Sequence, residues 1–382
     1  MMTINFKHIL LGVIFIIFIA CNTKHSREID TQDAIDTIVF NNKSVRADSL
    51  PISNYTFLPL QTTEESLFAI ISKLIHKNGK FYILDAHVTS ALFIFSDKGE
   101  FLYKIDNKGR GFGQYITLND FDVDEQDNVY ISDMQSRKII KFSNGAPQNE
   151  IQLSVPFLEF AINKNVSENL VLFKTFGDND VDYILSTYNQ QDSKISRIQK
   201  ADPLFDKSSI TVFSPFGLYK SPNYLSYYKR FSNSIYRYDY TSLKRRMMLD
   251  TDLLPTEDNI KQAVKARNNL SNVEFIKDIT EIYENNDYLY FCIHKGNQNI
   301  STLFSKITKT AIFANSVSRS IPMTSEIFNV SEQGFVAAYY PNFENKENLM
   351  DSLKLNGIKT AELKKIEKIS PGDNPVLVFI NF

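Results

Sequence analysis

The stretch FYILDAHVTSALFIFSDKGEF (81–101) returns in altered form as VYISDMQSRKIIKFSNGA (129–146). Residues 82–85 align with residues 130–133 at an offset of 48 positions. Each copy holds a short apolar run that ends in Asp, then a polar turn, a second apolar run and a glycine turn. Runs rich in Ile, Val, Tyr and Phe between such turns are typical of β-strands. The two stretches therefore predict a repeated unit of antiparallel strands.

The same rhythm continues along the rest of the chain. Four fainter units follow, at 169–195, at 223–249, at 287–314, and at 334–340 together with 374–382. A period of about 40–50 residues with four strands in each unit is typical of a β-propeller blade. The sequence therefore predicts an all-β fold, a six-bladed β-propeller over residues 34–382.

Two segments interrupt the strand pattern and read as helical insertions. The first, 256–270, starts with Thr256 as a plausible N-cap, and the second, 344–369, ends before a Pro-Gly pair. A propeller also closes its ring by pairing strands from the two ends of the chain. We expect AIDTIVF (34–40) to be the closing strand, paired with the last blade near VLVFINF (376–382).

The N-terminus carries a targeting pattern. The apolar run 9–20 is too short to span a bilayer and has the length of a signal-peptide core. Phe18-Ile19-Ala20-Cys21 resembles the bacterial lipobox, although Phe18 stands where Leu is usual. The resemblance implies a lipid on the Cys21 thiol and cleavage before it, giving a signal peptide over 1–20 and a flexible tether over 21–33. An ordinary secretory signal and a short anchor helix are the alternatives.

Composition limits the partners and the redox chemistry. The net charge of −2 argues against a nucleic-acid partner, which would require a basic face. Cys292 is the only cysteine besides Cys21, so no intramolecular disulfide can form once Cys21 is lipidated. Within the apolar run YLYFCIHK, Cys292 is expected to be a buried small side chain, with a reactive thiol as the alternative.

Several segments together resemble a known family. These are the lipobox-like start, LPLQTTEESLFAIISKLIHKNGKFYILD (58–85), GRGFGQY (109–115), VDEQDNVYISD (123–133) and DNPVLVFINF (373–382). The chain resembles the six-bladed β-propeller lipoproteins common in Bacteroidetes, which are relatives of NHL-repeat proteins. The family's glycine loop usually reads Gly-x-Gly-Pro-Gly-Glu-Tyr, whereas this chain has Phe112 and Gln114 in place of Pro and Glu. The resemblance implies architecture more than activity.

The glycine loop KIDNKGRGFGQY (104–115) invites comparison with phosphate-binding loops. A dinucleotide fingerprint needs Gly-x-Gly-x-x-Gly between a strand and a helix, and a P-loop ends in Gly-Lys-Ser/Thr. Here the spacing is Gly-x-Gly-x-Gly, and a hairpin pattern follows. We therefore expect a corner between the outer strand of one blade and the inner strand of the next, with Phe112 and Tyr115 packed over the blade edge.

Two sets of acidic residues allow a ligand-binding and a structural interpretation. The cluster FDVDEQDNVY (121–130) lacks the Gly and Glu of an EF-hand, so a turn between strands is favoured over calcium. Asp85 and Asp133 end equivalent strands. We expect each to cap the following turn through side-chain to backbone bonds. A ring of carboxylates at the pore is the alternative.

Three histidines, His76, His87 and His294, lie outside the signal and tether. Three ligands could hold a catalytic zinc, and some NHL-like propeller enzymes bind metal through histidines of different blades. Nothing in the spacing predicts that these three converge, and no Gly-x-Ser-x-Gly or His-Glu-x-x-His motif occurs. No metal site and no cofactor are predicted.

A tyrosine-rich stretch, YKSPNYLSYYKRFSNSIYRYDY (219–240), is the candidate binding surface. Tyrosine offers a large contact area with a polar tip, which suits peptide or sugar binding. The residues predicted to form this surface are Tyr224, Tyr227, Tyr228, Arg230, Tyr236 and Tyr238. The alternative is a blade whose aromatic side chains alternate between core and edge.

These observations favour a binding or scaffold module over an enzyme. We expect a lipid-anchored protein of the cell envelope that binds an envelope protein or a glycan. A metal-dependent lyase or hydrolase with its site in the central channel is the alternative. Residues 21–30, CNTKHSREID, lack an early acidic run after the cysteine. We therefore predict an outer-membrane lipoprotein on the periplasmic face rather than on the cell surface.

Overall fold

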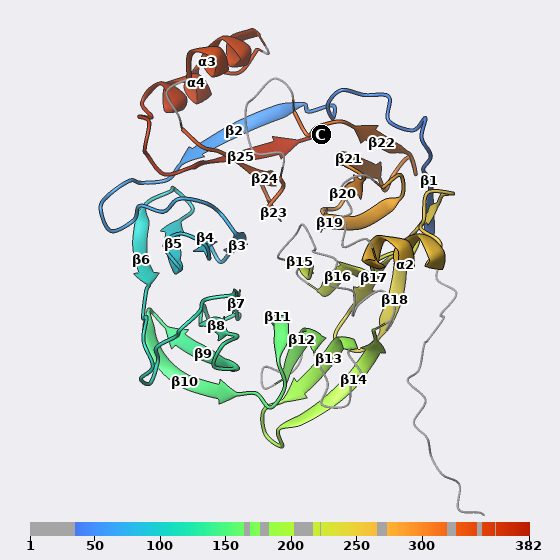
Figure 1. The fold of residues 1–382 in the computed structure, drawn as a ribbon. Helices are drawn as coiled ribbons and strands as arrows, with labels where there is room; N and C mark the ends of the chain where they lie inside the picture. Colours follow the sequence, from blue (N-terminus) through green and yellow to red (C-terminus); the bar gives the residue numbers. More distant parts are fainter. Residues whose placement is uncertain are drawn as a thin grey trace, which may run out of the picture.

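The computed structural model describes residues 35–163, 169–175, 183–201, 217–221, 223–265, 273–318, 326–341, 346–355 and 357–382. Antiparallel blades surround a central axis in this part of the chain (Figure 1). The predicted all-β, six-bladed propeller is confirmed. The predicted signal peptide, the tether and Cys21 lie outside the described residues.

The first three blades follow the chain order from the channel outward. Blade 1 consists of β3 (Lys73–Lys77), β4 (Lys80–Asp85), β5 (Ala91–Ser96) and β6 (Phe101–Ile105). Blade 2 consists of β7 (Asp120–Val123), β8 (Val129–Asp133), β9 (Lys138–Ser143) and β10 (Ala146–Gln152). Blade 3 consists of β11 (Phe157–Ile162), β12 (Asn169–Thr175), β13 (Tyr183–Asn189) and β14 (Lys194–Lys200).

The last three blades take in the N-terminal strands. Blade 4 consists of β15 (Tyr219–Ser221), β16 (Tyr224–Tyr228), β17 (Ser234–Tyr238), β18 (Leu243–Asp250) and β1 (Asp36–Val39). Blade 5 consists of β19 (Ile276–Glu284), β20 (Tyr288–Lys295), β21 (Gln298–Ser305) and β22 (Ala311–Ala314). Blade 6 consists of β23 (Asn329–Ser331), β24 (Gly334–Tyr339), β25 (Val376–Asn381) and β2 (Asn54–Pro59).

The strand pattern of each blade follows from how the blades stack. The middle strands are covered on both faces by neighbouring blades, so β4 and β5 are almost continuously apolar and buried. The outer strand β6 instead alternates between partly buried and exposed positions. Buried side chains therefore form clusters between blades rather than one central core. The centre of the ring is left to the innermost strands.

The prediction for ring closure was wrong. Strand β1 pairs in parallel with β18, with Asp36 opposite Met247, and so adds a fifth strand to blade 4. The ring is closed by β2, which pairs antiparallel with β25 from Asn54 opposite Asn381 onward. Between β1 and β2 the chain passes along blade 5, where the Asn315 N–H donates to the Ala47 carbonyl at 3.1 Å. Both N-terminal segments suit a strand, and their local sequence does not specify the partner.

Both predicted helical insertions are confirmed over their described residues, while 266–270, 344–345 and 356 lie outside them. Helix α2 (Glu257–Lys265) starts after Thr256, whose Oγ1 accepts from the Asn259 N–H at 3.2 Å. The second insertion forms two helices, α3 (Lys346–Leu355) and α4 (Thr360–Glu367). No helix within the described ranges is long and apolar enough to cross a membrane.

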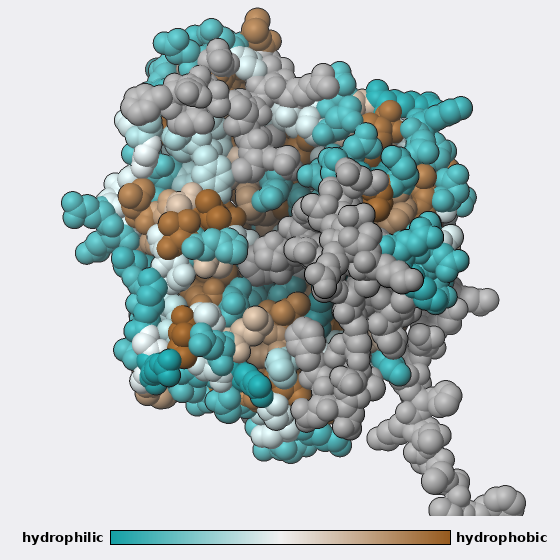
Figure 2. All heavy atoms as spheres, viewed as in Figure 1, coloured by the Kyte–Doolittle hydropathy of each residue, from teal (hydrophilic) through white to brown (hydrophobic). Residues whose placement is uncertain are grey.

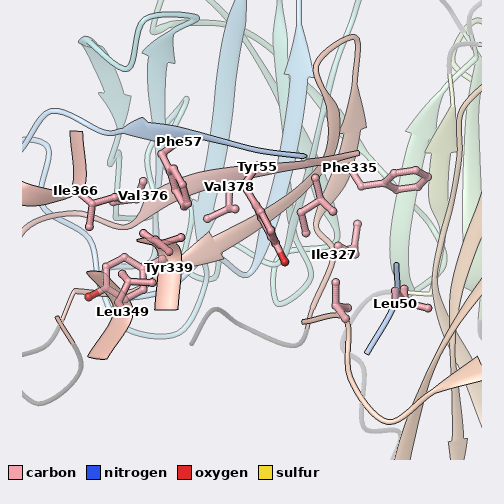
Figure 3. Packing of buried hydrophobic residues seen from close by; sticks show 14 of the residues in the cluster. Leu50, Tyr55, Phe57, Ile327, Phe335, Tyr339, Leu349, Ile366, Val376 and Val378 are labelled. Carbon is pink, nitrogen blue, oxygen red and sulfur yellow. The ribbon is translucent and has the colours of Figure 1, made fainter. Parts of the chain in front are cut away.

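Helices α3 and α4 cover the closing strand. Figure 3 shows Leu349 and Ile366 of these helices near Phe57, Val376 and Val378 of blade 6, all members of one buried cluster. On the outer edge of β2, the Phe57 N–H donates to the Glu362 carboxylate at 2.8 Å, and the Phe57 carbonyl accepts from Lys365 Nζ at 2.9 Å. An exposed strand edge is a site of unwanted pairing. The helical insertion therefore protects the edge of the strand that closes the ring.

Candidate functional site

The innermost strand of each blade, β3, β7, β11, β15, β19 or β23, lies nearest the central axis of the ring, here called the channel (Figure 1). Ladder hydrogen bonds link strands only within a blade, so adjacent inner strands are joined by side chains. Asp120 and Asp122 on β7 accept from the Phe160 and Ile162 N–H groups of β11 at 3.0 and 2.7 Å. Glu159 on β11 accepts from the Leu218 N–H at 3.1 Å.

Similar bonds continue around the ring. Glu281 on β19 accepts from the Ile327 N–H at 2.8 Å, just before β23. Asn329 Nδ2 on β23 donates to the Leu74 carbonyl of β3 at 2.8 Å, and Lys77 Nζ on β3 donates to the Val123 carbonyl of β7 at 2.9 Å. Buried polar groups are stable only when hydrogen-bonded. Because these bonds supply partners for the polar groups, a polar wall around the channel can be largely buried.

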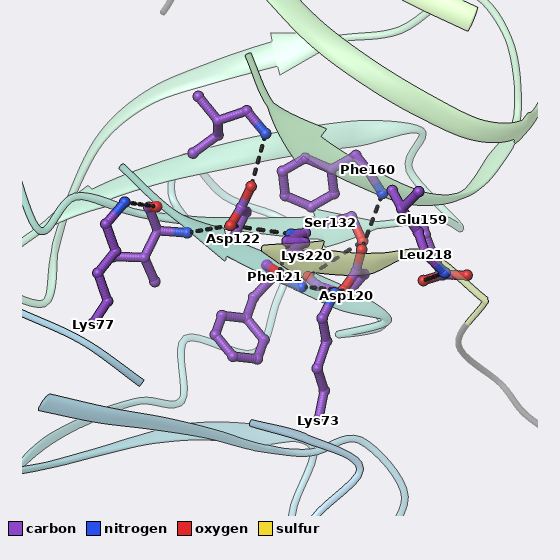
Figure 4. A network of polar contacts seen from close by, with 12 residues as sticks. Lys73, Lys77, Asp120, Phe121, Asp122, Ser132, Glu159, Phe160, Leu218 and Lys220 are labelled. Atoms are coloured by element: carbon purple, nitrogen blue, oxygen red, sulfur yellow. Dashed lines mark hydrogen bonds and ion pairs between the residues drawn. The ribbon is translucent and has the colours of Figure 1, made fainter. Parts of the chain in front are cut away.

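A charged network occupies this wall (Figure 4). Lys220 Nζ lies 3.0 Å from Asp122 Oδ1, and Lys73 pairs with Asp120. The side chains of Lys220 and Asp122 are only 16% and 10% exposed. Two ammonium groups from β3 and β15 thus lie against two carboxylates from β7.

The surroundings shift the pKa values of this network. Burial raises the pKa of Asp122, but Lys220 and the Ile162 N–H outweigh this and hold it below its ordinary value. Burial lowers the pKa of Lys220 to about 8, although Asp122 opposes the shift. Burial and the neighbouring Asp120 raise the pKa of Glu159 to about 7. Such perturbed groups are enriched at functional sites.

One end of the channel opens into a cavity of about 340 Å³, here called the channel-mouth pocket. It is formed by the ends of β3, β7, β11 and β15, by β23 and by the turn after β17. Its polar lining includes His76, Lys77, Asn78, Asp122, Glu125, Lys220 and Tyr240. Figure 4 shows Asp122 between Lys77 and Lys220. Charged side chains from separate blades therefore lie together in this pocket.

Tyr240 reaches this pocket through an unusual turn. Its backbone has a φ of 68°, a left-handed value that is costly for a bulky residue. The turn is fixed by Asp239, whose Oδ1 accepts from the Thr241 and Ser242 N–H groups at 3.0 and 2.7 Å. Burial raises the pKa of Asp239, but these hydrogen bonds outweigh burial and lower the pKa to about 2. Local bonding thus holds the Tyr240 ring in the pocket wall.

The predicted capping role of Asp85 and Asp133 is confirmed. Asp85 accepts from the Val88 and Ala69 N–H groups at 2.9 and 3.0 Å. Asp133 accepts from the Ile116 N–H at 2.8 Å and the Ser136 hydroxyl at 2.7 Å. Both lie on second strands, behind the channel wall. The carboxylates at the channel come instead from the inner strands.

The acidic residues that follow β7 form a turn between strands, which is the interpretation that the sequence favoured. Asp124 Oδ1 accepts from the Gln126 and Asn128 N–H groups, each at 2.9 Å. Asp122 belongs to the channel network instead. Throughout the described part of the chain, no group of three or more His, Cys, Asp or Glu side chains is placed to hold a metal ion.

The glycine loop connects β6 to β7, as predicted for a corner between blades. The Gly109 N–H donates to the Tyr115 carbonyl at 2.9 Å, and Tyr115 is fully buried with its hydroxyl donating to the Ser90 carbonyl at 2.7 Å. The packing prediction for Phe112 was wrong, because this side chain is 66% exposed. Tyr115 alone packs against the blade.

The histidines do not come together. His76 on β3 stacks on Phe81 with ring centroids 4.3 Å apart, and burial lowers its pKa. His87 is exposed in the turn after β4. His294 on β20 is buried and bonds Thr280 Oγ1 at 2.7 Å. Of the three, only His76 lines the channel-mouth pocket.

The tyrosine-rich stretch lies mostly inside blade 4. Tyr227, Tyr228 and Tyr238 are buried, which leaves three of the six predicted surface residues. Those three are half-buried: Tyr236 stacks on Tyr227 at 5.6 Å, the Tyr224 hydroxyl bonds Glu284, and Arg230 pairs with Asp278 at 3.7 Å. The pattern fits the alternative of aromatic side chains shared between core and edge. Cys292 is buried on β20, as expected.

Lys77, Lys220 and Tyr240 were not among the side chains predicted to form a site, although Lys220 and Tyr240 lie within the stretch 219–240. A usable signal was present in Asp120 and Asp122, because two charges at alternate positions of a predicted inner strand point to one face. Lys220 and Tyr240, near the two ends of the tyrosine-rich stretch, line the pocket instead.

The face opposite the pocket is different in character. The turns between second and third strands and the loops between blades lie on this face, which is turned to the viewer in Figure 2. Apolar side chains gather there over blades 1 and 2. Exposed apolar residues in these loops are Leu67, Ile70, Val88, Phe112, Ile116 and Met134. The polar pocket and these apolar side chains thus occupy opposite ends of the ring.

The fold and the site define a six-bladed β-propeller with a polar pocket at one mouth of its channel. The chain belongs to the family described as Domain of unknown function (DUF4934), whose model matches residues 27–381. No curated protein matches it.

Solved structures of low sequence identity share the fold. A protein from Bacteroides fragilis NCTC 9343 that is named as exported is 19% identical, with a TM-score of 0.74 over 91% of this chain and 99% of that one. A member of the duf4221 family from Bacteroides vulgatus is 10% identical, with a TM-score of 0.52 over 86% and 97%. A streptogramin B lyase, at a TM-score of 0.39 and 9% identity, is too distant to support an argument about activity.

Proposed function

We propose that this protein is a lipid-anchored binding module of the cell envelope that takes its ligand in the channel-mouth pocket. The observation that carries the proposal is the pocket itself: about 340 Å³, lined by charged and aromatic side chains of several blades. Ligand sites are typically concave, largely pre-formed and of 300 Å³ or more. The buried ion pairs beneath it supply that pre-formed geometry.

The bonding of one carboxylate of the pocket, Asp122, favours binding over chemistry. Asp122 Oδ1 accepts from the Val123 N–H at 2.8 Å and faces Lys220, while Oδ2 accepts from the Ile162 N–H. A carboxylate engaged at both oxygens is held in place and is poorly suited to take a proton from a ligand. A rigid, satisfied polar network instead reduces the ordering that binding requires.

The location in the proposal rests on the sequence of the N-terminus and on the neighbour from Bacteroides fragilis that is named as exported. We place the protein at the periplasmic face of the outer membrane, with a lipid on Cys21 and an envelope protein or glycan as partner. Cys21→Ala should abolish labelling by an alkyne-tagged fatty acid in growing cells and release the protein from the membrane fraction. Unchanged labelling would contradict lipidation.

The binding function is tested by crosslinking in intact cells. Gln126 is exposed at the rim of the channel-mouth pocket, and Gln126→Trp would fill the opening. Gln148→Trp on the outer strand β10 is the matched control at an exposed position away from the pocket. We expect mass spectrometry to find a captured molecule that is lost with Gln126→Trp and kept with Gln148→Trp. Equal capture by both variants would refute a site in this pocket.

A further inference from the structure

We infer that the channel-mouth pocket binds a neutral, hydroxyl-rich ligand, namely the terminal sugar of a glycan. This inference rests on the proposed binding function. It follows from the pairing of charges around the pocket, from the remaining hydrogen-bond donors of its lysines and from the buried polar floor.

The charges of the pocket are arranged in pairs. Lys220 lies beside Asp122 at 3.0 Å, and Lys77 lies beside Glu125 at the same distance. The remaining lining carboxylate, Asp124, faces Lys141 at 4.0 Å. An anionic ligand that approaches an ammonium group would meet a carboxylate beside it. A cationic ligand that approaches a carboxylate would meet an ammonium group beside it. Like charges brought together in a partly desolvated site are strongly unfavourable, so a neutral ligand fits best.

The same pairs can serve hydroxyl groups. A hydroxyl both donates and accepts, and an ammonium group has three donors. Lys77 Nζ donates to the Val123 carbonyl and to Glu125, and Lys220 Nζ donates to the Phe121 carbonyl and to Asp122. Within the part of the chain that the structure describes, neither ammonium group has a third hydrogen-bond partner, so each lysine has one donor left beside a carboxylate acceptor. Adjacent donors and acceptors match the neighbouring hydroxyls of a sugar ring.

The rest of the wall suits the apolar face of a sugar. Ile75, Ile162, Val330 and the Tyr240 ring line the pocket between the polar groups. An aromatic or aliphatic surface can cover the C–H face of a sugar ring while its hydroxyls bond at the edge. The pocket therefore offers both kinds of contact that a sugar requires.

The floor of the pocket limits how a glycan can enter. Beneath Asp122 and Lys220 lie Asp120 and Glu159, which are 0% and 2% exposed. The floor of the pocket is therefore formed by buried side chains, with Asp120 paired to Lys73 and Glu159 accepting from the Leu218 N–H. The cavity of about 340 Å³ lies near the lower limit of ligand-site volumes. These two facts favour a chain end inserted from outside over an internal segment of a glycan.

The test is titration calorimetry of the purified mature protein with size-matched sugars. The panel contains neutral hexoses and N-acetylhexosamines, the corresponding uronic acids and amino sugars, and short neutral peptides. We expect at least one neutral sugar to bind at least tenfold more tightly than its uronic acid and amino counterparts. Gln126→Trp should abolish this binding and Lys77→Gln should weaken it, whereas Gln148→Trp should leave it unchanged.

Two failures can be told apart. Tighter binding of a uronic acid, an amino sugar or a peptide, or no binding of any neutral sugar, would overturn the sugar inference. Pocket-dependent crosslinking in cells would in that case still support the binding function. Sugar binding that survives Gln126→Trp would overturn the assignment to this pocket.

Discussion

Removing the carboxylate of Asp122 should be among the most destabilising single changes in this protein. Asp122→Ala deletes the acceptor for the Val123 and Ile162 N–H groups and the counter-ion of Lys220. Lys220 would keep its buried position, with a side chain only 16% exposed. Asp122 also joins blade 2 to blade 3, so its loss weakens the ring where two inner strands meet.

The expected magnitude follows from burial. Breaking a buried ion pair by removing one partner costs about 3–5 kcal/mol, because the other charge is left unpaired. At about 2.1 cal/mol/K per residue, the predicted propeller, residues 34–382, has an unfolding entropy of about 0.7 kcal/mol/K. A loss of about 4 kcal/mol should therefore lower the melting temperature by about 5 °C. The chain has no Trp, so far-UV circular dichroism on heating is the suitable assay, at pH 6, about two units below the lowered pKa of Lys220.

A double-mutant cycle separates the ion pair from other effects. In Asp122→Ala/Lys220→Met no unpaired charge remains, so the double variant should regain about 2 kcal/mol over Asp122→Ala. Lys261→Met, on an exposed helix where Lys261 pairs with Glu257, is the control and should cost less than about 0.5 kcal/mol. The reasoning is refuted if Asp122→Ala costs less than about 1 kcal/mol, or if the two substitutions are additive.

Three further predictions concern the fold. Burial raises the pKa values of Glu159 and Glu281 to about 7 and about 8, from 4.5. Between about pH 4.5 and pH 8 the folded protein therefore binds more protons than the unfolded chain. The free energy of unfolding should fall as the pH rises through this range, and Glu281→Gln should make this fall smaller. Glu362→Ala should cost about 2 kcal/mol in calorimetry, since it leaves a buried N–H of β2 without its acceptor, and Glu362→Gln should cost less. Gly113→Ala should destabilise by about 1–3 kcal/mol more than Gly357→Ala. Both glycines have similar positive φ, but a Cβ at Gly113 would collide with the Pro147 ring, whereas a Cβ at Gly357 would meet open space.

The sequence alone determined the repeat, the strand content and several local contacts. Alternating apolar runs and turns are short-range patterns, so the blades could be read from them directly. The capping roles of Asp85 and Asp133 were also predictable, because each side chain bonds backbone groups two to four residues further on. The same holds for Thr256 at the start of α2.

Only the tertiary structure decided how the ring closes. Asn54 pairs with Asn381, more than 300 positions away, whereas the predicted partner segment around Asp36 pairs with blade 4. A strand pattern encodes which residues face inward but not which distant strand lies alongside, because pairing depends on the path of the whole chain.

The channel-mouth pocket was decided in the same way. Lys77, Asp122 and Lys220 come from three blades and are separated by 45 and 98 positions, yet Asp122 lies 3.0 Å from Lys220. Their sequence neighbourhoods are ordinary strands and give no sign of convergence. A ring of blades brings every inner strand to one axis, so residues far apart in sequence meet there only once all the blades have formed.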